Sequence, residues 1–385
     1  MARDFSIDIH SDDIKTPVFI VFKQALQENL HILKKVQDEA GCKILLALKG
    51  FAMWSLFPQI SEVLHGICAS SPHEARLGRE EFKREVHSYA AAFSESHLKE
   101  LLEYSDHIIF NSFSQWEQHQ LVIQPYKEKI EFGIRINPEH SEVDIPVYDP
   151  CGEKSRLGVT EKNFKDKPLD GIDGLHFHVL CEDNSLALER TLKQVEEKFG
   201  SHLNSMKWIN FGGGHHITRE DYDVDHLCNL IINFKERYNL EVYLEPGEAI
   251  ALHTGILMSS VLDIIHNETD IAILDTSAAA HMPDVIEMPY RPEVLNGFTP
   301  DTYEHNYKLG GLSCLAGDVI GDYSFKEPLK VGDKISFLDM AHYTMVKTNT
   351  FNGIQLPSIA VYDEETKELT IVKEFGYENF KNRLS

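Results

Sequence analysis

Short apolar runs alternate with segments of helical periodicity between residues 43 and 245. Eight runs have the length and composition of buried strands: residues 43–48, 65–69, 86–90, 107–110, 130–136, 174–179, 206–211 and 241–244. Several intervening helices have clear starts, as at Ser94 before residues 98–104 and at Ser185 before residues 186–199. Eight alternating units over this span predict a (β/α)8 barrel rather than a doubly wound open sheet.

The pattern changes after Glu245. Strand-like runs at 271–274, 334–338 and 359–361 are broken by Gly, Pro and Asp, with few long helical patterns. These runs predict a second, β-rich domain, and the early run 18–22 is expected to pair with it. The predicted organisation is therefore an α/β barrel over residues 23–255 and a β-rich domain formed by residues 1–22 and 256–385.

Composition excludes several classes of protein. The 385 residues carry a formal net charge of -24, which disfavours binding to nucleic acid or to an anionic membrane surface. No signal-peptide pattern and no apolar stretch long enough for a membrane helix is present, so a cytoplasmic location is expected. The six cysteines are scattered without a Cys-x-x-Cys pair, which argues against a zinc knuckle or a disulfide scaffold.

The candidate chemistry lies where the predicted strands end, because barrel active sites form at the carboxyl ends of the strands. An amine, a cation, two imidazoles, a glycine loop and two acids occur there: Lys49, Arg135, His176, His178, Gly212-Gly213-Gly214, Glu245 and Glu248. Desolvation at the mouth of an apolar strand would lower the pKa of Lys49 and make it an imine-forming nucleophile. A lysine that merely extends to water is the structural alternative.

The other strand-end groups point to a phosphorylated, flat cofactor. Three glycines let backbone N–H groups approach a phosphate, although a lone Gly-Gly-Gly is more often a turn. His176 and His178 are expected on one face of their strand. For His176, a packed core histidine is an equally good interpretation. A buried Glu245 would need a cationic partner, which a protonated ring nitrogen supplies. Together these groups indicate pyridoxal 5'-phosphate.

Over nearly its whole length the sequence resembles the barrel-type pyridoxal phosphate decarboxylases. This group contains diaminopimelate and ornithine decarboxylases. The matching motifs are Ala47-Leu48-Lys49, Cys68-Ala69-Ser70, His176-Phe177-His178, Phe211-Gly212-Gly213-Gly214, Glu245-Pro246-Gly247, Cys314-Leu315-Ala316-Gly317-Asp318 and Asp339-Met340-Ala341-His342-Tyr343-Thr344. The resemblance implies an alanine racemase-like barrel of pyridoxal phosphate fold type III. It also implies a homodimer with shared active sites.

The resemblance further implies roles for individual residues. Lys49 would hold the cofactor covalently, His178 would stack on its ring, and Glu245 would pair with the ring nitrogen. The phosphate would be bound by Gly212–Gly214 and Tyr343, and Arg135 is expected among the cofactor-binding residues. Cys314 of the partner chain would complete the site and return a proton to the substrate.

Two departures from the wider group bear on the substrate. Glu248 follows Glu-Pro-Gly where the group usually has arginine, and the usual Cys-Glu-Ser-Gly-Asp lacks its glutamate here. A pocket that has gained an anion should reject a distal carboxylate and accept an ammonium. The resemblance within the group is to the carboxynorspermidine decarboxylase branch, which also acts on carboxyspermidine. It implies a small cationic carboxypolyamine substrate contacted by Glu248, Asp284 and Asp318.

Alternative functions remain open at this stage. Diaminopimelate decarboxylase is the nearest, and Glu248 argues against it. A metal-dependent barrel hydrolase is another alternative, suggested by the 20 histidines, His-Phe-His and His215-His216. No clear set of partner ligands accompanies these histidines at the strand ends, so no metal site is predicted. A non-enzymatic homologue is disfavoured by the presence of both Lys49 and Cys314. Carboxynorspermidine and carboxyspermidine differ by one methylene, which the sequence does not rank.

Overall fold

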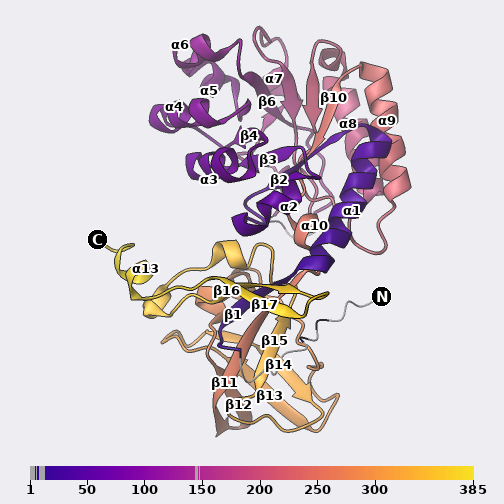
Figure 1. Cartoon of the computed structure of the whole chain (residues 1–385). Helices are drawn as coiled ribbons and strands as arrows, with labels where there is room; N and C mark the ends of the chain where they lie inside the picture. The colour runs from indigo at the N-terminus through magenta and orange to yellow at the C-terminus, as the bar shows by residue number, and fades with distance from the viewer. Residues whose placement is uncertain (1–4, 6, 8–13, 144–145, 147) are drawn as a thin grey trace. The chain divides into compact units, whose positions relative to one another are not determined.

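The chain divides into two compact units in the computed structural model, which describes residues 5, 7, 14–143, 146 and 148–385 (Figure 1). One unit is Asn29–Ile250 and the other combines Met1–Glu28 with Ala251–Ser385. Part of the predicted β-rich domain, residues 1–4, 6 and 8–13, lies outside the described residues.

The first unit is built on a closed barrel of parallel strands. In ring order its strands are β2 (Lys43–Ala47), β3 (Gly66–Ala69), β4 (Glu85–Tyr89), β5 (His107–Phe110), β6 (Glu131–Asn137), β8 (Gly174–His176), β9 (Trp208–Asn210) and β10 (Glu241–Leu244). Each pairs with the next, and β10 pairs with β2 to close the ring. The predicted barrel is confirmed, and all eight predicted runs contain a strand. The two-residue β7 (Val159–Thr160) pairs with β6 outside the ring.

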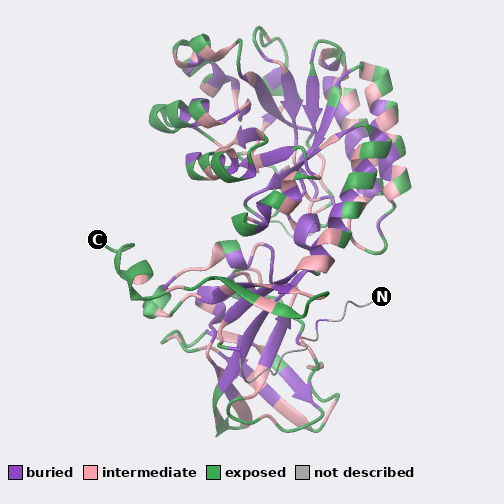
Figure 2. Cartoon of the chain, in the orientation of Figure 1, coloured by how far each residue is buried: buried purple, intermediate pink, exposed green. Residues whose placement is uncertain are grey.

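Helices surround this barrel and turn their polar faces to solvent, whereas the strands are buried (Figure 2). They are α1 (Lys23–Ala40), α2 (Phe57–Ser61), α3 (Pro72–Leu77), α4 (Glu95–Tyr104), α5 (Phe113–Gln118), α6 (Gln120–Ile123), α7 (Glu161–Phe164), α8 (Ser185–Leu203), α9 (Val224–Tyr238) and α10 (Glu248–Ala251). Ser94 caps α4 by accepting a hydrogen bond from the His97 N–H, as its position predicted. Asn184 rather than Ser185 caps α8, accepting from the Leu186 N–H.

A layer of large side chains fills the middle of the barrel. Leu45, Ile109, Trp208 and Tyr243 form one buried cluster. The Trp208 indole fits because two facing positions are glycine: a Cβ on Gly174 would lie 2.1 Å from the indole, and one on Gly133 would lie 2.4 Å from it. The barrel interior is therefore filled by side chains rather than open.

The second unit contains an eight-stranded mixed sheet. Its order is β14 (Val319–Phe325), β13 (His305–Gly310), β12 (Thr269–Leu274), β11 (Gly255–Asn267), β1 (Val18–Phe22), β16 (Ser358–Asp363) and β17 (Glu368–Lys373), with β15 (Lys334–Leu338) also paired to β11. The three predicted late runs lie in β12, β15 and β16, and β1 pairs with β11 and β16 as expected.

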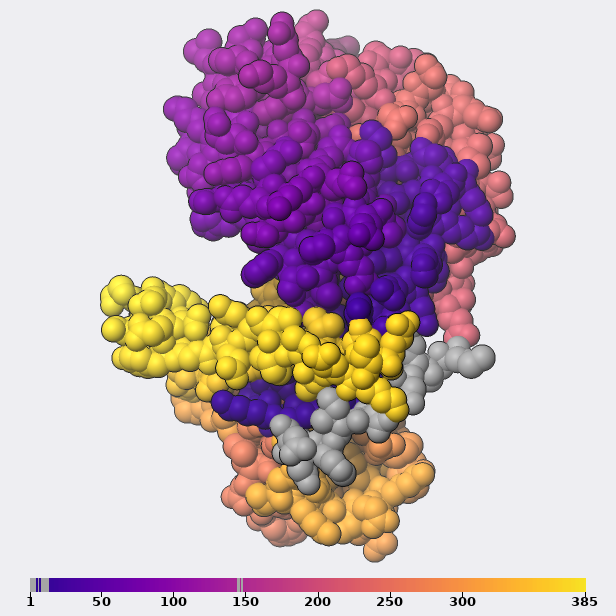
Figure 3. Space-filling view, in the orientation of Figure 1, coloured from indigo at the N-terminus to yellow at the C-terminus, as the bar shows by residue number. Residues whose placement is uncertain are grey.

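Three short helices complete this unit: α11 (Ala278–His281), α12 (Asp284–Glu287) and α13 (Tyr377–Lys381). The last strand, β17, is mostly exposed, and the segment after it lies on the surface (Figure 3). Within the described part of the chain, no helix is long and apolar enough to cross a membrane.

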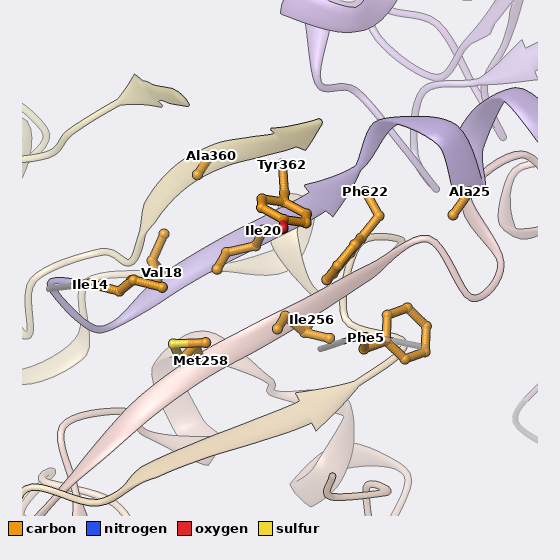
Figure 4. Packing of buried hydrophobic residues seen from close by; sticks show 10 residues of the cluster. All are labelled: Phe5, Ile14, Val18, Ile20, Phe22, Ala25, Ile256, Met258, Ala360 and Tyr362. Carbon is orange, nitrogen blue, oxygen red and sulfur yellow. The ribbon is translucent and has the colours of Figure 1, made fainter. Parts of the chain in front are cut away.

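The core of the second unit brings the start of the chain together with much later strands (Figure 4). Its buried members are Phe5, Ile14, Val18, Ile20, Phe22, Ala25, Ile256, Met258, Ala360 and Tyr362. The Phe22 ring contacts Phe5 and Tyr362 edge-on, at centroid distances of 5.2 Å and 5.5 Å. This aromatic packing ties β1 to β16, so both ends of the sequence belong to one core.

Candidate active site

Lys49 lies in a tight turn just after β2. The turn is closed by hydrogen bonds from the Gly50 N–H (2.9 Å) and the Phe51 N–H (3.3 Å) to the Ala47 carbonyl. It packs against the loop after β10, because a Cβ on Gly50 would lie only 2.9 Å from the Gly247 Cα. Lys49 is exposed in the single chain, so the burial expected from its position after an apolar strand is not observed. The turn directs the residue away from the hydrophobic interior.

Glu245, which follows β10, is a buried carboxylate. Its Oε1 accepts a hydrogen bond from Asn210 Nδ2 at 2.6 Å, and its Oε2 lies 3.2 Å from His176 Nε2. Burial alone would raise the pKa of Glu245, but its interactions with His176 and Asn210 hold that pKa below its usual range. Burial also lowers the pKa of His176, so a neutral His176 donates to an ionised Glu245.

His176 and His178 do not share the role that strand alternation suggested. β8 ends at His176, so the regular alternation does not extend to His178. His178 Nδ1 accepts a hydrogen bond of 2.8 Å from the Gly213 N–H, which assigns the ring proton to Nε2 in a neutral ring. Although the residue keeps some exposed surface, desolvation and then repulsion by Lys49 and Arg135 lower the pKa of His178 well below its usual value.

Close backbone contacts require glycine at all three positions of the loop after β9. Gly212 and Gly214 have φ values of 71° and 83°, and a Cβ on Gly214 would lie 1.9 Å from the Leu180 carbonyl oxygen. A Cβ on Gly213 would lie 2.5 Å from the Glu245 carbonyl oxygen. The loop therefore fits between the segments that follow β8 and β10, directly beside the buried carboxylate.

Arg135 on β6 connects several of these groups. It is buried, and its Nη2 donates to the His178 carbonyl at 2.9 Å. Its guanidinium lies 4.8 Å from the centre of the Tyr89 ring, which stacks on His176 at 5.4 Å. The Tyr89 hydroxyl donates to Asn111 at 2.7 Å. Arg135 thus holds the segment after β8 in place.

Sequence reasoning missed three members of this network: Tyr89, Asn111 and Asn210. Tyr89 and Asn210 end β4 and β9, and Asn111 directly follows β5. They share a position at the carboxyl end of a barrel strand, but each is a neutral side chain that no motif or charge pattern marks.

Glu248 begins α10 and is partly buried. Its Oε2 lies 3.1 Å from Nε2 of the buried His216, whose Nδ1 lies 3.4 Å from Arg219 Nη1. The Glu248 carboxylate, which distinguishes this chain from the wider group, is therefore held in position by the buried His216.

Asp284 and Asp318 both lie in the second unit. Asp284 forms an ion pair with Lys347, which also contacts Glu287 at 3.2 Å. Asp318 is buried and accepts hydrogen bonds from Ser277 Oγ (2.8 Å) and the Ser313 N–H (3.0 Å). Their predicted substrate contacts remain predictions; in the single chain both carboxylates have partners within their own unit.

Cys314 and Tyr343 lie in loops of the same unit. Cys314 is exposed, and its N–H donates to Asn352 Oδ1 at 2.8 Å. Asp318, through the Ser313 N–H, anchors the loop immediately before this cysteine. Tyr343 has a φ of 50°, and its carbonyl accepts from the Lys347 N–H at 3.0 Å. Both loops are thus held by internal hydrogen bonds.

The protein has the fold of the fold-type III pyridoxal phosphate enzymes. The features that define this class here are the barrel, the strand-end lysine, the buried glutamate and the second, sheet-containing unit. Residues 145–341 match the family described as "Pyridoxal-dependent decarboxylase, C-terminal sheet domain". The chain belongs to the pyridoxal-dependent decarboxylase family.

Individual relatives cover nearly the whole chain. A Campylobacter jejuni protein named "Carboxynorspermidine/carboxyspermidine decarboxylase" is 46% identical, over 97% of this chain and 99% of its own length. A Synechocystis protein named "Carboxyaminopropylagmatine decarboxylase" is 45% identical over 96% of each. The crystal structure of Campylobacter jejuni carboxynorspermidine decarboxylase complexed with norspermidine has a TM-score of 0.89 and 45% identity, covering 96% of this chain and 100% of that one.

The residues present fit the family's cofactor, pyridoxal phosphate. Glu245 is a buried anion, and among the described residues no lysine or arginine forms an ion pair with it. A buried charge of this kind is stabilised by a cationic partner, and the protonated ring nitrogen of the cofactor has the matching charge. The neighbouring glycine loop and the neutral His178 ring suit a phosphate and a flat aromatic ring respectively.

Proposed function

We propose that this protein decarboxylates carboxynorspermidine, carboxyspermidine or both, in polyamine biosynthesis. The observation that carries the proposal is the 46% identity, over almost the full length of both chains, to the Campylobacter jejuni relative of that name. The diaminopimelate decarboxylase alternative has weaker support, since a Thermoplasma acidophilum protein of that name is 22% identical.

Pyridoxal phosphate, when bound, supplies an electron sink for the electron pair that is released as carbon dioxide leaves. In the proposed site Lys49 would hold the cofactor and would release the product. Glu245, kept ionised by Asn210 and His176, would pair with the protonated ring nitrogen and keep the proton there. His178, neutral and fixed by the Gly213 N–H, would pack on the ring.

The remaining cofactor contacts follow from the same loops. The phosphate would be bound by Gly212–Gly214 and Tyr343. Arg135 holds the His178 backbone in position. The Gly212 N–H already donates to Asn210 and the Gly213 N–H to His178, so phosphate binding by this loop would depend on the Gly214 N–H.

Substrate selection is proposed to depend on charge. Glu248 replaces a cation found in the wider group and would attract a distal ammonium while repelling a distal carboxylate. Asp284 and Asp318 are proposed to add to this contact. For Asp284 the substrate ammonium would have to compete with Lys347, which occupies the carboxylate in the single chain.

The active enzyme is proposed to be a cytoplasmic homodimer with shared active sites. Cys314 of one chain would serve the barrel of the other and return a proton to the α-carbon after carbon dioxide leaves. Its exposure in the single chain and the anchoring of its loop by Asp318 support this role.

A second candidate substrate is carboxyaminopropylagmatine. The 45% identity to the Synechocystis relative is nearly as high as that to the Campylobacter jejuni protein. The agmatine end carries a guanidinium, which a carboxylate such as Glu248 can bind through two hydrogen bonds, whereas an ammonium acts as a point charge. The two candidates therefore make different demands on the same anion.

The proposal is tested by carbon dioxide release with purified protein and pyridoxal phosphate. The substrates are carboxynorspermidine, carboxyspermidine, carboxyaminopropylagmatine, diaminopimelate and ornithine. We expect the highest kcat/KM with the first two. A clear preference for carboxyaminopropylagmatine would replace the proposed substrate, and turnover of diaminopimelate alone would reject the charge argument.

The role of Glu248 is tested in the same assay. Glu248→Arg should lower kcat/KM for the carboxypolyamines by about a hundredfold, since it replaces attraction by repulsion of a distal amine. Glu100→Arg, at an exposed position on α4, makes the same charge change and should leave kcat/KM unchanged. Equal values for Glu248→Arg and Glu100→Arg would remove Glu248 from substrate recognition.

A further inference from the structure

A second cluster of titratable groups lies at the amino-terminal end of the barrel, where the strands begin. Glu85 is the first residue of β4, His87 lies two residues further along, and His107 is the first residue of β5. His87 and His107 are paired in register between the two strands. Because side chains two residues apart on a strand share a face, Glu85 and His87 point to the same side.

The donor atoms of this cluster converge. One atom from each of Glu85, His87 and His107 lies within 4.8 Å of the others. Nε2 of His107 lies 3.2 Å from Glu85 Oε1, and Nε2 of His87 lies 3.7 Å from Glu85 Oε2. Ligand atoms around a tetrahedral zinc ion with bonds of about 2.0–2.1 Å are roughly 3.4 Å apart. The two distances to Glu85 are therefore those of a metal-ligand set. The His87 and His107 rings stack at a centroid distance of 3.9 Å, so one ring has to turn for both lone pairs to reach one ion.

His87 lacks the hydrogen bonds expected of a buried imidazole. It is fully buried, and within the described part of the chain neither of its ring nitrogens has a hydrogen-bond partner. A polar group left in this state is costly and calls for a missing partner.

A hollow borders the acid of this cluster. A hollow of about 400 Å³ is lined by Glu85 and by His65, whose Nε2 lies 2.8 Å from Glu85 Oε2. His65 is half-exposed and can supply a fourth donor. Cationic side chains also lie close by: Arg84 lines the same hollow, Lys43 lies 3.7 Å from Glu241, and Lys207 lies 3.3 Å from Glu131. Glu131 in turn lies 3.9 Å from His107, so each of the two lysines is paired with an acid.

We propose that Glu85, His87 and His107 bind a divalent zinc-type cation, with His65 as the fourth ligand. Imidazole and carboxylate donors favour zinc and its neighbours over magnesium or calcium, which prefer oxygen ligands. Four protein ligands leave no open position, so the ion is structural. It links the starts of β3, β4 and β5 at the end of the barrel where side chains serve stability rather than catalysis.

The test uses the full-length holoenzyme, stripped with a chelator and titrated with zinc chloride alone against a chromophoric chelator. We expect one ion per chain, a higher Tm, and unchanged carbon dioxide release when the ion is removed. His107→Gln should weaken zinc binding at least tenfold. His31→Gln, at an exposed position on α1, is the matched control and should bind as the unsubstituted protein does.

A misfolded variant would also lose binding, so a second measurement uses the unsubstituted protein. Cobalt(II) in place of zinc should give the intense visible absorption of a tetrahedral site, and zinc should abolish it. The proposal is overturned if no ion binds more tightly than micromolar, or if His107→Gln retains stoichiometric zinc. The first result would indicate a hydrogen-bonded histidine cluster only, and the second an ion held elsewhere on the chain.

Discussion

The two ends of the barrel contain similar groups in different settings. At the carboxyl end Glu245 lies 3.2 Å from His176, and at the amino end Glu85 lies 3.2 Å from His107. The first pair borders loops that carry Lys49 and the glycines, whereas the second lies on residues within the paired strands. A glutamate–histidine pair therefore does not identify an active site by itself. The loops beside it decide whether a reactive amine and a ligand can reach it.

The strand β2 offers a direct test of this contrast, because it has a lysine near each end. Lys49→Ala should reduce carbon dioxide release by at least about a thousandfold, since it removes the proposed anchoring amine. Lys43→Ala, at the first position of the same strand, should leave activity within about twofold. Activity assays and visible absorption of the bound cofactor measure both effects. A Lys49→Ala enzyme with normal turnover would contradict the proposed site.

The packed layer between the two ends can be disturbed at Gly174. Gly174→Ala should lower the free energy of unfolding by about 3 kcal/mol, because the new Cβ would overlap the Trp208 indole. Gly152→Ala is the control: its Cβ would lie 3.6 Å from the nearest atom, and its effect should stay within about 0.5 kcal/mol. Urea denaturation gives both values. Equal stability of the two variants would show that the layer adapts to the extra methyl group.

The smallest expected effect concerns pH and His215, which follows the glycine loop. Burial lowers the pKa of His215 to about 4. Since the unfolded chain takes up this proton near pH 6.5 and the folded chain does not, stability is complete above pH 6.5 and falls as the pH drops toward 4. Between pH 7.5 and pH 5 this should cost about 2 kcal/mol.

Replacing His215 isolates this contribution. The measurement is the change in unfolding free energy between pH 7.5 and pH 5. In His215→Gln this loss of stability should be smaller by about 2 kcal/mol than in the unsubstituted protein. His73→Gln, at an exposed position on α3, should behave as the unsubstituted protein. Identical pH profiles for all three proteins would mean that His215 is protonated in the folded state.

The strand pattern of the barrel was predictable because strands buried inside a closed barrel are short and continuously apolar. Every predicted run contains a strand, although four of the eight strands are shorter than their runs. The strand in the run 174–179 ends at His176. Periodicity does not report where a loop leaves the sheet. For this reason the separate positions of His176 and His178 were visible only in three dimensions.

The candidate site was predictable to the extent that it consists of charged groups at strand ends. The partners of those groups were not, because Asn210 reaches Glu245 and His216 reaches Glu248 from neighbouring elements. The exposure of Lys49 was also missed, since the turn after β2 leads the chain away from the apolar run before it. The amino-end cluster was not predicted, because barrel active sites form at the carboxyl ends of the strands.

Trp208 gives the molecule a built-in optical reporter. Its ring lies 5.1 Å from His107 and is almost fully buried, whereas Trp54 is 56% exposed. An excited indole loses energy by electron transfer to a nearby protonated imidazole, and a bound open-shell ion quenches it as well. Trp116 is buried as well, so in a Trp116→Phe protein the blue-edge fluorescence lifetime should follow events at the amino end of the barrel without any attached dye.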